Sequence, residues 1–443
     1  MILIEQASYV VRDADRIERN VDLLIDGERI VRVGPIDRTG LPVDTTVLDG
    51  RGRAVIPGMV NAHGHLYQTM LKGRRDDLPL VRWCDEVTFP FVRRVLSDAW
   101  THGETTIGRL WSSVATIEMI RSGITTFVDM DMNLDGVIQT WVEAGIRGVA
   151  AMTLVDQWVP DDLMLAPEKT REDALALIET WHRVPKERPL VTVFLGPSAP
   201  FTSSEALLRW IRETADAHNL GIQTHISETT WEVEQSVALV GRTPLAYLES
   251  IGFLTSPITA AHCVHLTPEE IALAGERRVG VIYNPKSNMK LGSGIAPIVA
   301  LRRAGASIAL GTDGAASNDL LDPFEEMRAA AMLQKVAAQD PTVLGARDVF
   351  RFATETGAQV CRIDAGVLDP GKLADVVLID LSGAHLFRTT DEILPALVYC
   401  ARASDVETVV IGGRIVLRTR EVTTLDERAV LAEARKVGER YGR

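Results

Sequence analysis

Cysteine and long apolar runs are scarce in this chain, and basic residues are fewer than acidic ones. The 443 residues include only four cysteines, which show no paired spacing. This excludes a disulfide framework and predicts reduced thiols in the cytoplasm. Lysine and arginine number 47 against 60 acidic residues, for a net charge of −13, without any basic block. These features exclude a nucleic-acid surface and favour a small-molecule substrate.

No segment approaches the roughly 18 uninterrupted apolar residues that a membrane span needs. The first 34 residues carry too many charges for the apolar stretch of a signal peptide. We therefore expect no membrane partner and a cytoplasmic location. The sequence does not give the number of subunits, so a homo-oligomer stays open.

Both ends of the chain are rich in β-branched residues and tight turns. The segments "VDLLIDGERIVRVG" and "VETVVIGGRIVLRT" each contain two strand-like runs around a turn. We predict that residues 1–56 and 366–425 pair into one small β-sandwich domain. Residues 426–443 have the pattern of an amphipathic C-terminal helix.

The middle of the chain, residues 57–365, alternates short apolar runs with helix-like stretches. Eight strand candidates occur, from the run that ends at His63 to "SIALGTDG". Eight strands alternating with helices indicate an α/β fold of the distorted (β/α)8 TIM-barrel type. An open doubly wound sheet is the alternative, but no GxGxxG motif follows the first strand.

Residues that bind metals stand at the ends of four of these predicted strands, where a barrel places its site. His63 and His65 are two residues apart, so both imidazoles point the same way from a strand. The other strand ends carry His225 with Glu228, His262, and Asp313. Neutral imidazoles with one carboxylate suit one divalent metal ion, zinc first, with iron or manganese as alternatives.

Each residue also has an ordinary structural interpretation. A single histidine near a strand end is more often a hydrogen-bonded structural residue, and Asp313 alone could cap a helix or form a turn. The joint placement at four strand ends outweighs these alternatives. Structural roles are expected for five other histidines: His102, His182, His218, His265 and His385.

The segments "PGMVNAHGH", "THISET", "AHCVHL" and "LGTDGAASN" resemble the signature segments of the amidohydrolase superfamily. The branch that the chain resembles holds adenosine-thioether and S-adenosylhomocysteine deaminases, oxopurine deaminases and triazine hydrolases. The resemblance implies that one metal is bound by four residues: His63, His65, His225 and Asp313. It also implies that Glu228 and His262 act on the substrate. Binuclear branches carry a lysine or glutamate on strand four, and "LVTVFLGPS" has neither, which favours a single metal.

These residues allow a hydrolytic deamination. A bound divalent metal lowers the pKa of water to about 7. Asp313 would accept the water proton, Glu228 would protonate the adjacent ring nitrogen, and His262 would stabilise the attacking oxygen. The expected function is therefore a metal-dependent aminohydrolase that releases ammonia from an aminated N-heterocycle.

Three other functions stay open for the same residues. The first is a 5′-methylthioadenosine/S-adenosylhomocysteine-type nucleoside deaminase. The second is a triazine hydrolase that releases chloride or alkylamine. A non-enzymatic scaffold is disfavoured, because the chain keeps all six central residues.

Four residues are expected to contact the substrate: Gln68, Trp83, Met152 and Trp158. By resemblance, adenosine-thioether deaminases place a ribose-binding glutamate where ungapped counting gives Val92 here. Members that take S-adenosylhomocysteine place carboxylate-binding arginines where this chain has Met152 and Met164. These differences predict a more apolar pocket and favour a bare or alkyl-substituted heterocycle over a nucleoside.

Overall fold

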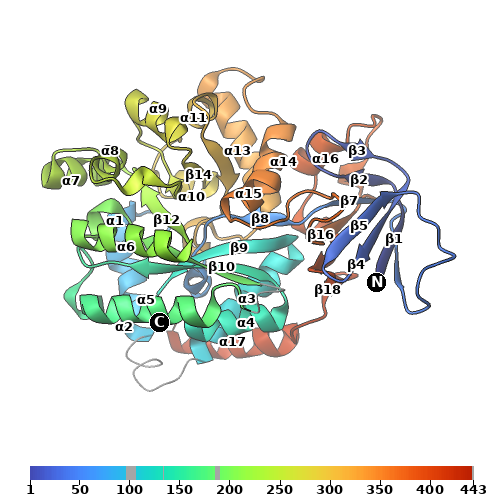
Figure 1. Cartoon of the computed structure of the whole chain (residues 1–443), viewed down its shortest axis with the longest axis horizontal. Helices are drawn as coiled ribbons and strands as arrows, with labels where there is room; N and C mark the ends of the chain where they lie inside the picture. The colour runs from blue at the N-terminus through green and yellow to red at the C-terminus, as the bar shows by residue number, and fades with distance from the viewer. Residues whose placement is uncertain (96–105, 133, 185–189, 442–443) are drawn as a thin grey trace.

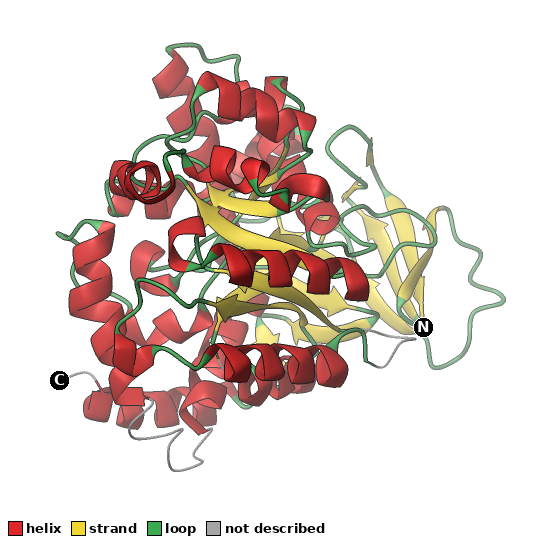
Figure 2. Ribbon diagram, turned by 60° about the vertical axis from the view of Figure 1, so that its left-hand side comes forward, coloured by secondary structure: helices red, strands yellow, loops and turns green. Residues whose placement is uncertain are grey.

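The computed structural model describes residues 1–95, 106–132, 134–184 and 190–441. Its centre is a barrel of eight parallel strands enclosed by helices (Figures 1 and 2). The strands follow one another in chain order: β8 (Met59–Asn61), β9 (Ile124–Asp131), β10 (Arg147–Leu154), β11 (Val191–Pro197), β12 (Gly221–Ile226), β13 (Thr259–His262), β14 (Gly280–Tyr283) and β15 (Ser307–Leu310). The prediction of a (β/α)8 barrel is confirmed.

The first and last barrel strands meet through backbone hydrogen bonds. The amide of Ala62 donates to the carbonyl of Leu310 at 2.9 Å, and the amide of Asp313 donates to the carbonyl of His63 at 3.0 Å. The loops that follow β8 and β15 are therefore neighbours. Two predicted metal ligands, His63 and Asp313, lie side by side although 250 residues separate them in the chain.

Helices cover the outer face of the barrel: α3 (Thr106–Arg121), α4 (Asp135–Ala144), α5 (Pro167–Trp181), α6 (Glu205–His218), α7 (Thr230–Val240), α8 (Pro244–Ser250), α9 (Pro268–Glu276), α11 (Ile298–Arg303), α13 (Pro323–Ala338) and α14 (Ala346–Ala353). The short helix α15 (Glu355–Val360) instead contributes Ala358 to the core inside the barrel. Alternate residues of each strand face opposite sides. On β10, Val149 and Ala151 belong to the core inside the barrel, whereas Ala150 and Met152 pack with the outer core.

The two ends of the chain form a second, all-β unit beside the barrel, as predicted (Figure 1). One sheet has the order β5 (Arg29–Gly34), β4 (Val21–Asp26), β1 (Ile2–Ala7) and β6 (Thr46–Asp49). The other has the order β19 (Glu421–Val422), β18 (Arg414–Arg418), β17 (Val406–Ile411), β16 (Val376–Asp380), β7 (Arg53–Pro57), β2 (Tyr9–Val11) and β3 (Ile17–Glu18). Buried Ile4, Leu23 and Leu378 share one core, so the two sheets pack as a sandwich.

Gly58 lies where the chain passes from β7 of the small unit to β8 of the barrel. A Cβ atom at this position would lie 2.1 Å from the hydroxyl oxygen of Thr125. The backbone at residue 58 can lie this close to Thr125 of β9 only because glycine has no side chain. The chain therefore changes from one unit to the other within one residue.

The predicted C-terminal helix is present as α17 (Glu427–Tyr441), which packs against α3 of the barrel (Figure 1). The residue limits of the three predicted domains stay a prediction. Within the described ranges, no helix combines the length and apolar character that crossing a membrane requires.

Candidate active site

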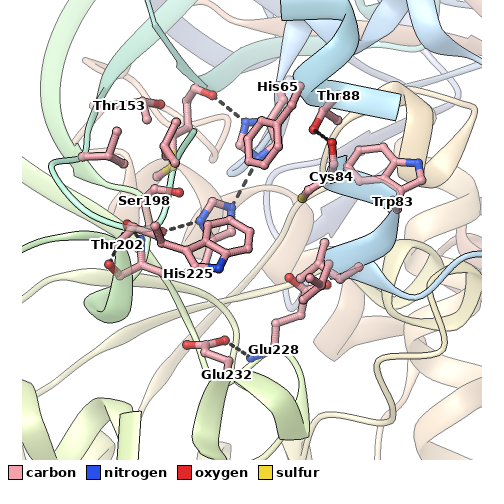
Figure 3. Close-up of a pocket in the computed structure, with 18 of the residues that line it drawn as sticks. His65, Trp83, Cys84, Thr88, Thr153, Ser198, Thr202, His225, Glu228 and Glu232 are labelled. Carbon is pink, nitrogen blue, oxygen red and sulfur yellow. Dashed lines mark hydrogen bonds between the residues drawn. The ribbon is translucent and has the colours of Figure 1, made fainter. Parts of the chain in front are cut away.

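Three imidazoles and one carboxylate converge at the carboxyl ends of β8, β12 and β15. One nitrogen or oxygen from each of these four residues lies within 4.8 Å of the others: His63, His65, His225 and Asp313. The Nε2 atoms of His65 and His225 are 3.3 Å apart (Figure 3). Oδ1 of Asp313 lies 3.4 Å from Nε2 of His63 and also from Nε2 of His65. The structure thus brings all four predicted ligands together.

Each of the three rings is oriented by an oxygen acceptor behind it. The Nδ1–acceptor distances are 2.8 Å from His63 to Gln223 Oε1, 2.5 Å from His65 to the Met130 carbonyl, and 2.5 Å from His225 to the Ser198 carbonyl. Because carbonyl and amide oxygens only accept, each Nδ1 carries the hydrogen. Each Nε2 lone pair is therefore turned towards the cluster, as in metal-binding histidines.

The donor set fits a divalent metal ion. The Nε2 atom of His63 is buried and has no hydrogen-bond partner in the described part of the chain. Burial, together with the neighbouring His63, lowers the pKa of His65 to about 4, and burial likewise holds the pKa of His225 well below its ordinary value. Neutral imidazoles are the ligating form, and three of them with one carboxylate suit zinc and similar ions.

Asp313 is held as a carboxylate by its neighbours. Its Oδ2 accepts hydrogen bonds from the hydroxyls of Ser287 at 2.6 Å and Ser317 at 2.9 Å. Burial opposes ionisation, but the adjacent imidazoles of His63 and His262 hold the pKa of Asp313 well below its ordinary value. Oδ1 is therefore a charged ligand atom that faces the imidazoles.

Glu228 and His262 form a second pair in the same cavity. Nε2 of His262 lies 3.5 Å from Oε2 of Glu228, and Ser293 donates to Oε1 of Glu228 at 3.0 Å. The side chain of Glu228 is buried, and this burial, with a contribution from Asp313, raises its pKa to about 8. Glu228 therefore holds a proton near neutral pH, as a general acid must.

The backbone at these strand ends takes unusual conformations. Ser227, His262 and Asp313 have φ values of 50°, 70° and 61°. Such left-handed conformations cost non-glycine residues about 1–2 kcal/mol each. These strained residues occur where the chain turns side chains from three different strands towards one point.

Three members of the cluster, His65, His225 and Asp313, line a cavity of about 1230 Å³, a volume that includes the part open to solvent. Figure 3 shows His65 and His225 among the lining residues. Three of the four predicted substrate contacts line this cavity: Gln68, Trp83 and Trp158. Met152 does not line it. Met152 lies on the outer face of β10 and packs in the core beneath the helices, whereas the next residue, Thr153, faces the cavity.

Gln68 is fixed against the loop that carries Asp313. Gln68 is buried, and Oε1 of its amide has no hydrogen-bond partner in the described ranges. A Cβ atom on Gly314 would lie 1.8 Å from this oxygen. A side chain at position 314 would therefore displace the amide of Gln68 from this position.

The described histidines for which structural roles were expected lie away from the metal cluster. Nε2 of His265 is 2.7 Å from the carbonyl of Ser293, and Nε2 of His385 is 2.8 Å from a carboxylate oxygen of Asp405. His182 accepts from a backbone amide of β11, and His218 ends α6. His102 lies outside the described residues.

Two residues outside the predicted set orient the site. Gln223 supports His63, and Oδ1 of Asn288 lies 2.8 Å from Nδ1 of His262. Gln223 was recognisable, because it stands two residues before His225 and so faces the same side of β12. Asn288 follows a different strand, and no local pattern connects it with His262.

Residues 54–416 match the sequence model of the Amidohydrolase family. The chain is 39% identical over 440 residues to a 5-methylthioadenosine/S-adenosylhomocysteine deaminase of Moorella thermoacetica, a match that covers 98% of each chain. It is 41% identical over 428 residues to a 5′-deoxyadenosine deaminase of Methanothermobacter thermautotrophicus, a match that covers 96% of each chain.

Two solved structures share the fold over almost the whole chain. An adenosine deaminase from Xanthomonas campestris with bound zinc has a TM-score of 0.91 and 32% identity, covering 99% of this chain and 98% of that one. A variant of atrazine chlorohydrolase from Arthrobacter aurescens TC1, complexed with zinc and atraton, has a TM-score of 0.90 and 26% identity, covering 99% and 100%.

Proposed function

Because this chain belongs to the amidohydrolase family and is a metal-dependent deaminase of cyclic amidines, we propose that it uses zinc to deaminate an adenosine nucleoside. The observation that carries the proposal is the cluster of three imidazoles and one carboxylate, of which His65, His225 and Asp313 line the same cavity as Glu228 and His262. The nucleoside is supported by the names of the two relatives at 39% and 41% identity, and zinc by the similar structure that holds it.

The predicted preference for a bare heterocycle loses part of its basis. Val92 does line the cavity, but neither Met152 nor Met164 is among the lining residues. An apolar residue at these two positions therefore says little about the substrate. The full-length similarity to nucleoside deaminases carries more weight.

The proposed reaction begins with the addition of water to the amino-bearing ring carbon. When bound, the divalent ion supplies a water molecule acidic enough to give up a proton near neutral pH. Asp313 accepts that proton on its carboxylate, which Ser287 and Ser317 hold in place. Glu228 gives its own proton to the adjacent ring nitrogen, and Nε2 of His262 accepts a hydrogen bond from the attacking water.

The carbon–nitrogen bond then breaks. Asp313 passes its proton to the departing amino group, which leaves as ammonia. The hydroxyl on the ring carbon becomes a carbonyl, and its proton returns to Glu228. One water is consumed, one ammonia is released, and both carboxyl groups end as they began.

A triazine hydrolase is the second candidate, because the atrazine chlorohydrolase variant has a TM-score of 0.90 to this chain. The same residues could expel chloride or an alkylamine in place of ammonia. Its lower identity, 26%, places it behind the nucleoside deaminases.

A substrate panel tests these alternatives. The zinc-loaded enzyme is assayed for release of ammonia from adenosine, 5′-deoxyadenosine, 5′-methylthioadenosine, adenine and guanine, and for release of chloride or alkylamine from atrazine. We expect ammonia from the nucleosides, with kcat/KM at least about tenfold higher than for the bare bases. Release from atrazine alone, or no turnover of any nucleoside, would overturn the proposal.

We also propose that the enzyme works in the cytoplasm. Its four cysteines, Cys84, Cys263, Cys361 and Cys400, are all unpaired in the structure, which suits a reducing compartment. A homo-oligomer stays a prediction that gel filtration with light scattering would test.

A further inference from the structure

Four aromatic side chains from different parts of the chain line one side of the cavity. They are Phe89 at the start of α2 (Phe89–Val95), Trp158 after β10, Phe201 in η5 (Pro200–Thr202) and Trp231 at the start of α7. Trp158 is central: its ring centroid lies 5.8 Å from Phe89, 5.2 Å from Phe201 and 5.7 Å from Trp231. We call these four residues the aromatic wall.

The aromatic wall adjoins the catalytic groups. Trp231 is three residues after Glu228, and Phe201 is three residues after Ser198, whose carbonyl orients His225. All of these residues line the same cavity. A heterocycle placed at the metal cluster would therefore extend its substituent along this wall.

Trp158 is the most exposed residue of the aromatic wall. Its exposed fraction is 39%, the largest of the four. Its φ of 65° lies in the left-handed region, which is costly for a bulky side chain. The protein therefore holds a large apolar surface in a strained conformation at the mouth of the cavity, where a ligand can cover it.

Contacts between neighbouring loops fix the segment that carries Trp158. The backbone amides of Asp156 and Gln157 both donate to the carbonyl of Thr202, at 3.1 and 3.0 Å. The carboxylate of Asp156 accepts from the amide of Ser204 at 2.7 Å and from its hydroxyl at 2.5 Å. Contacts within the protein therefore hold the wall in place, which reduces the entropic cost of binding.

The side chains that line the cavity include acidic groups but no permanently cationic group in the described part of the chain. Its acidic lining residues are Asp131, Glu228, Glu232 and Asp313, and no lysine or arginine lines it among the described residues. A carboxylate or phosphate on the substrate would lose its hydration without gaining a cationic partner. The cavity therefore disfavours an anionic substituent.

We propose that the aromatic wall binds the 5′ substituent of the nucleoside and selects neutral, apolar substituents over those that carry a carboxylate. This inference rests on the proposed nucleoside deamination. The substituent would cover the exposed indole of Trp158 and pack against Phe201 and Trp231. The wall would thus set specificity without touching the reacting carbon.

A series of 5′-alkylthioadenosines with methyl, ethyl, propyl and butyl groups tests the proposal. For the wild-type enzyme we expect kcat/KM to rise about threefold to fourfold with each added methylene, the gain for burying one CH2 group. A butyl chain that ends in a carboxylate should be at least about tenfold poorer than the neutral butyl chain.

Variants of the wall test whether it causes this dependence. Trp158→Ala should flatten the rise of kcat/KM with chain length, and Trp158→Phe, which keeps an aromatic ring, should restore part of it. Trp210→Ala is a matched control: Trp210 lies on α6 outside the cavity, with the Arg171 guanidinium 5.6 Å from its ring, and this variant should keep the wild-type slope. Metal content is measured for every variant.

The outcomes separate the two proposals. If the wild type deaminates nucleosides but the slope is the same in Trp158→Ala, the aromatic wall does not bind the substituent. Equal kcat/KM for the neutral and carboxylate-bearing chains would also overturn the inference. If the wild type deaminates no nucleoside, the proposed function itself fails, and this inference fails with it.

Discussion

Nδ1 of His262 lies 2.8 Å from Oδ1 of Asn288, and both side chains are buried beside the predicted metal site. The amide oxygen accepts, so Nδ1 of His262 carries the hydrogen and Nε2 faces Glu228 at 3.5 Å. Asn288 thus sets which ring nitrogen points into the cavity. The orientation of a proposed catalytic histidine depends on a residue from the next loop.

Asn288→Leu should therefore weaken catalysis more than binding. Without its acceptor the His262 ring can turn or change tautomer, and we expect kcat to fall about 10- to 100-fold, as for the outer partners of metal-binding histidines. KM should change less. Steady-state kinetics check this, with Asn288→Asp as the control that keeps an acceptor. An unchanged kcat in Asn288→Leu would contradict the assigned role.

Gln223→Leu should weaken metal binding. Oε1 of Gln223 lies 2.8 Å from Nδ1 of His63, and its amide nitrogen donates to the Ala62 carbonyl at 2.9 Å. Losing this support should lower metal affinity about 10- to 100-fold. Chelator competition with zinc measures the affinity, and Gln223→Glu, which keeps the acceptor, is the comparison. Equal affinities for the wild type and Gln223→Leu would refute the role.

Glu228→Gln should retain the metal and lose deamination. Burial raises the pKa of Glu228 to about 8, so the wild-type side chain holds a proton that it can transfer, whereas the amide of glutamine cannot. We expect kcat to fall by about 10²- to 10⁴-fold. Metal content by elemental analysis should match the wild type. Full activity with normal metal content would exclude Glu228 as the proton donor.

The sequence was sufficient to predict the barrel and the convergence of the candidate site residues, because both follow from the strand pattern, whereas the roles of these residues stay a prediction. Strand and helix periodicity identified eight β/α units, and the carboxyl ends of barrel strands meet at one face, so His63 and Asp313 could be placed together. Pairing between the chain ends was recognisable from their shared β-rich composition.

The contacts that the sequence did not predict depend on which face of a strand a residue occupies and on which loops meet. Met152 and Thr153 are adjacent on β10, yet only Thr153 reaches the cavity, and counting along the chain without a strand register does not separate them. The aromatic wall joins Phe89 to Trp231, 142 residues later, through loops whose paths no local pattern predicts. Asn288 and His262 are brought together in the same way.

Stability should depend on pH through Glu326, which lies on α13 away from the proposed ligands. Asn318 donates to its Oε1 at 2.6 Å, and Oε2 has no hydrogen-bond partner in the part of the chain that the structure describes. Burial raises its pKa to about 8 from an ordinary 4.5. The folded state therefore binds more protons than the unfolded state between these pH values, and stability falls as pH rises through this window.

Glu326→Gln removes this titration. The free energy of unfolding of the variant, relative to the wild type, should increase between about pH 5 and pH 8, by at most about 1.4 kcal/mol per pH unit. Urea unfolding at several pH values measures the difference. Parallel pH profiles for the two proteins would show that Glu326 is ionised in the folded state at every pH tested.

The ion pair between Arg147 and Asp375 should be important for joining the barrel to the terminal sheets. Nε of Arg147, at the start of β10, donates to Oδ2 of Asp375 at 2.7 Å, and the two residues are only 2% and 1% exposed. Oδ1 of Asp375 also accepts from the amide of Gly412 at 2.8 Å. Asp375→Ala removes a buried charge from beside Arg147, so we expect the free energy of unfolding to fall by about 3–5 kcal/mol. Denaturant unfolding measures this change.

The control is Asp49→Ala, which removes an exposed partner of Arg51 and should leave stability within experimental scatter. If Asp375→Ala were as stable as Asp49→Ala, the pair would make no net contribution to holding the two units together.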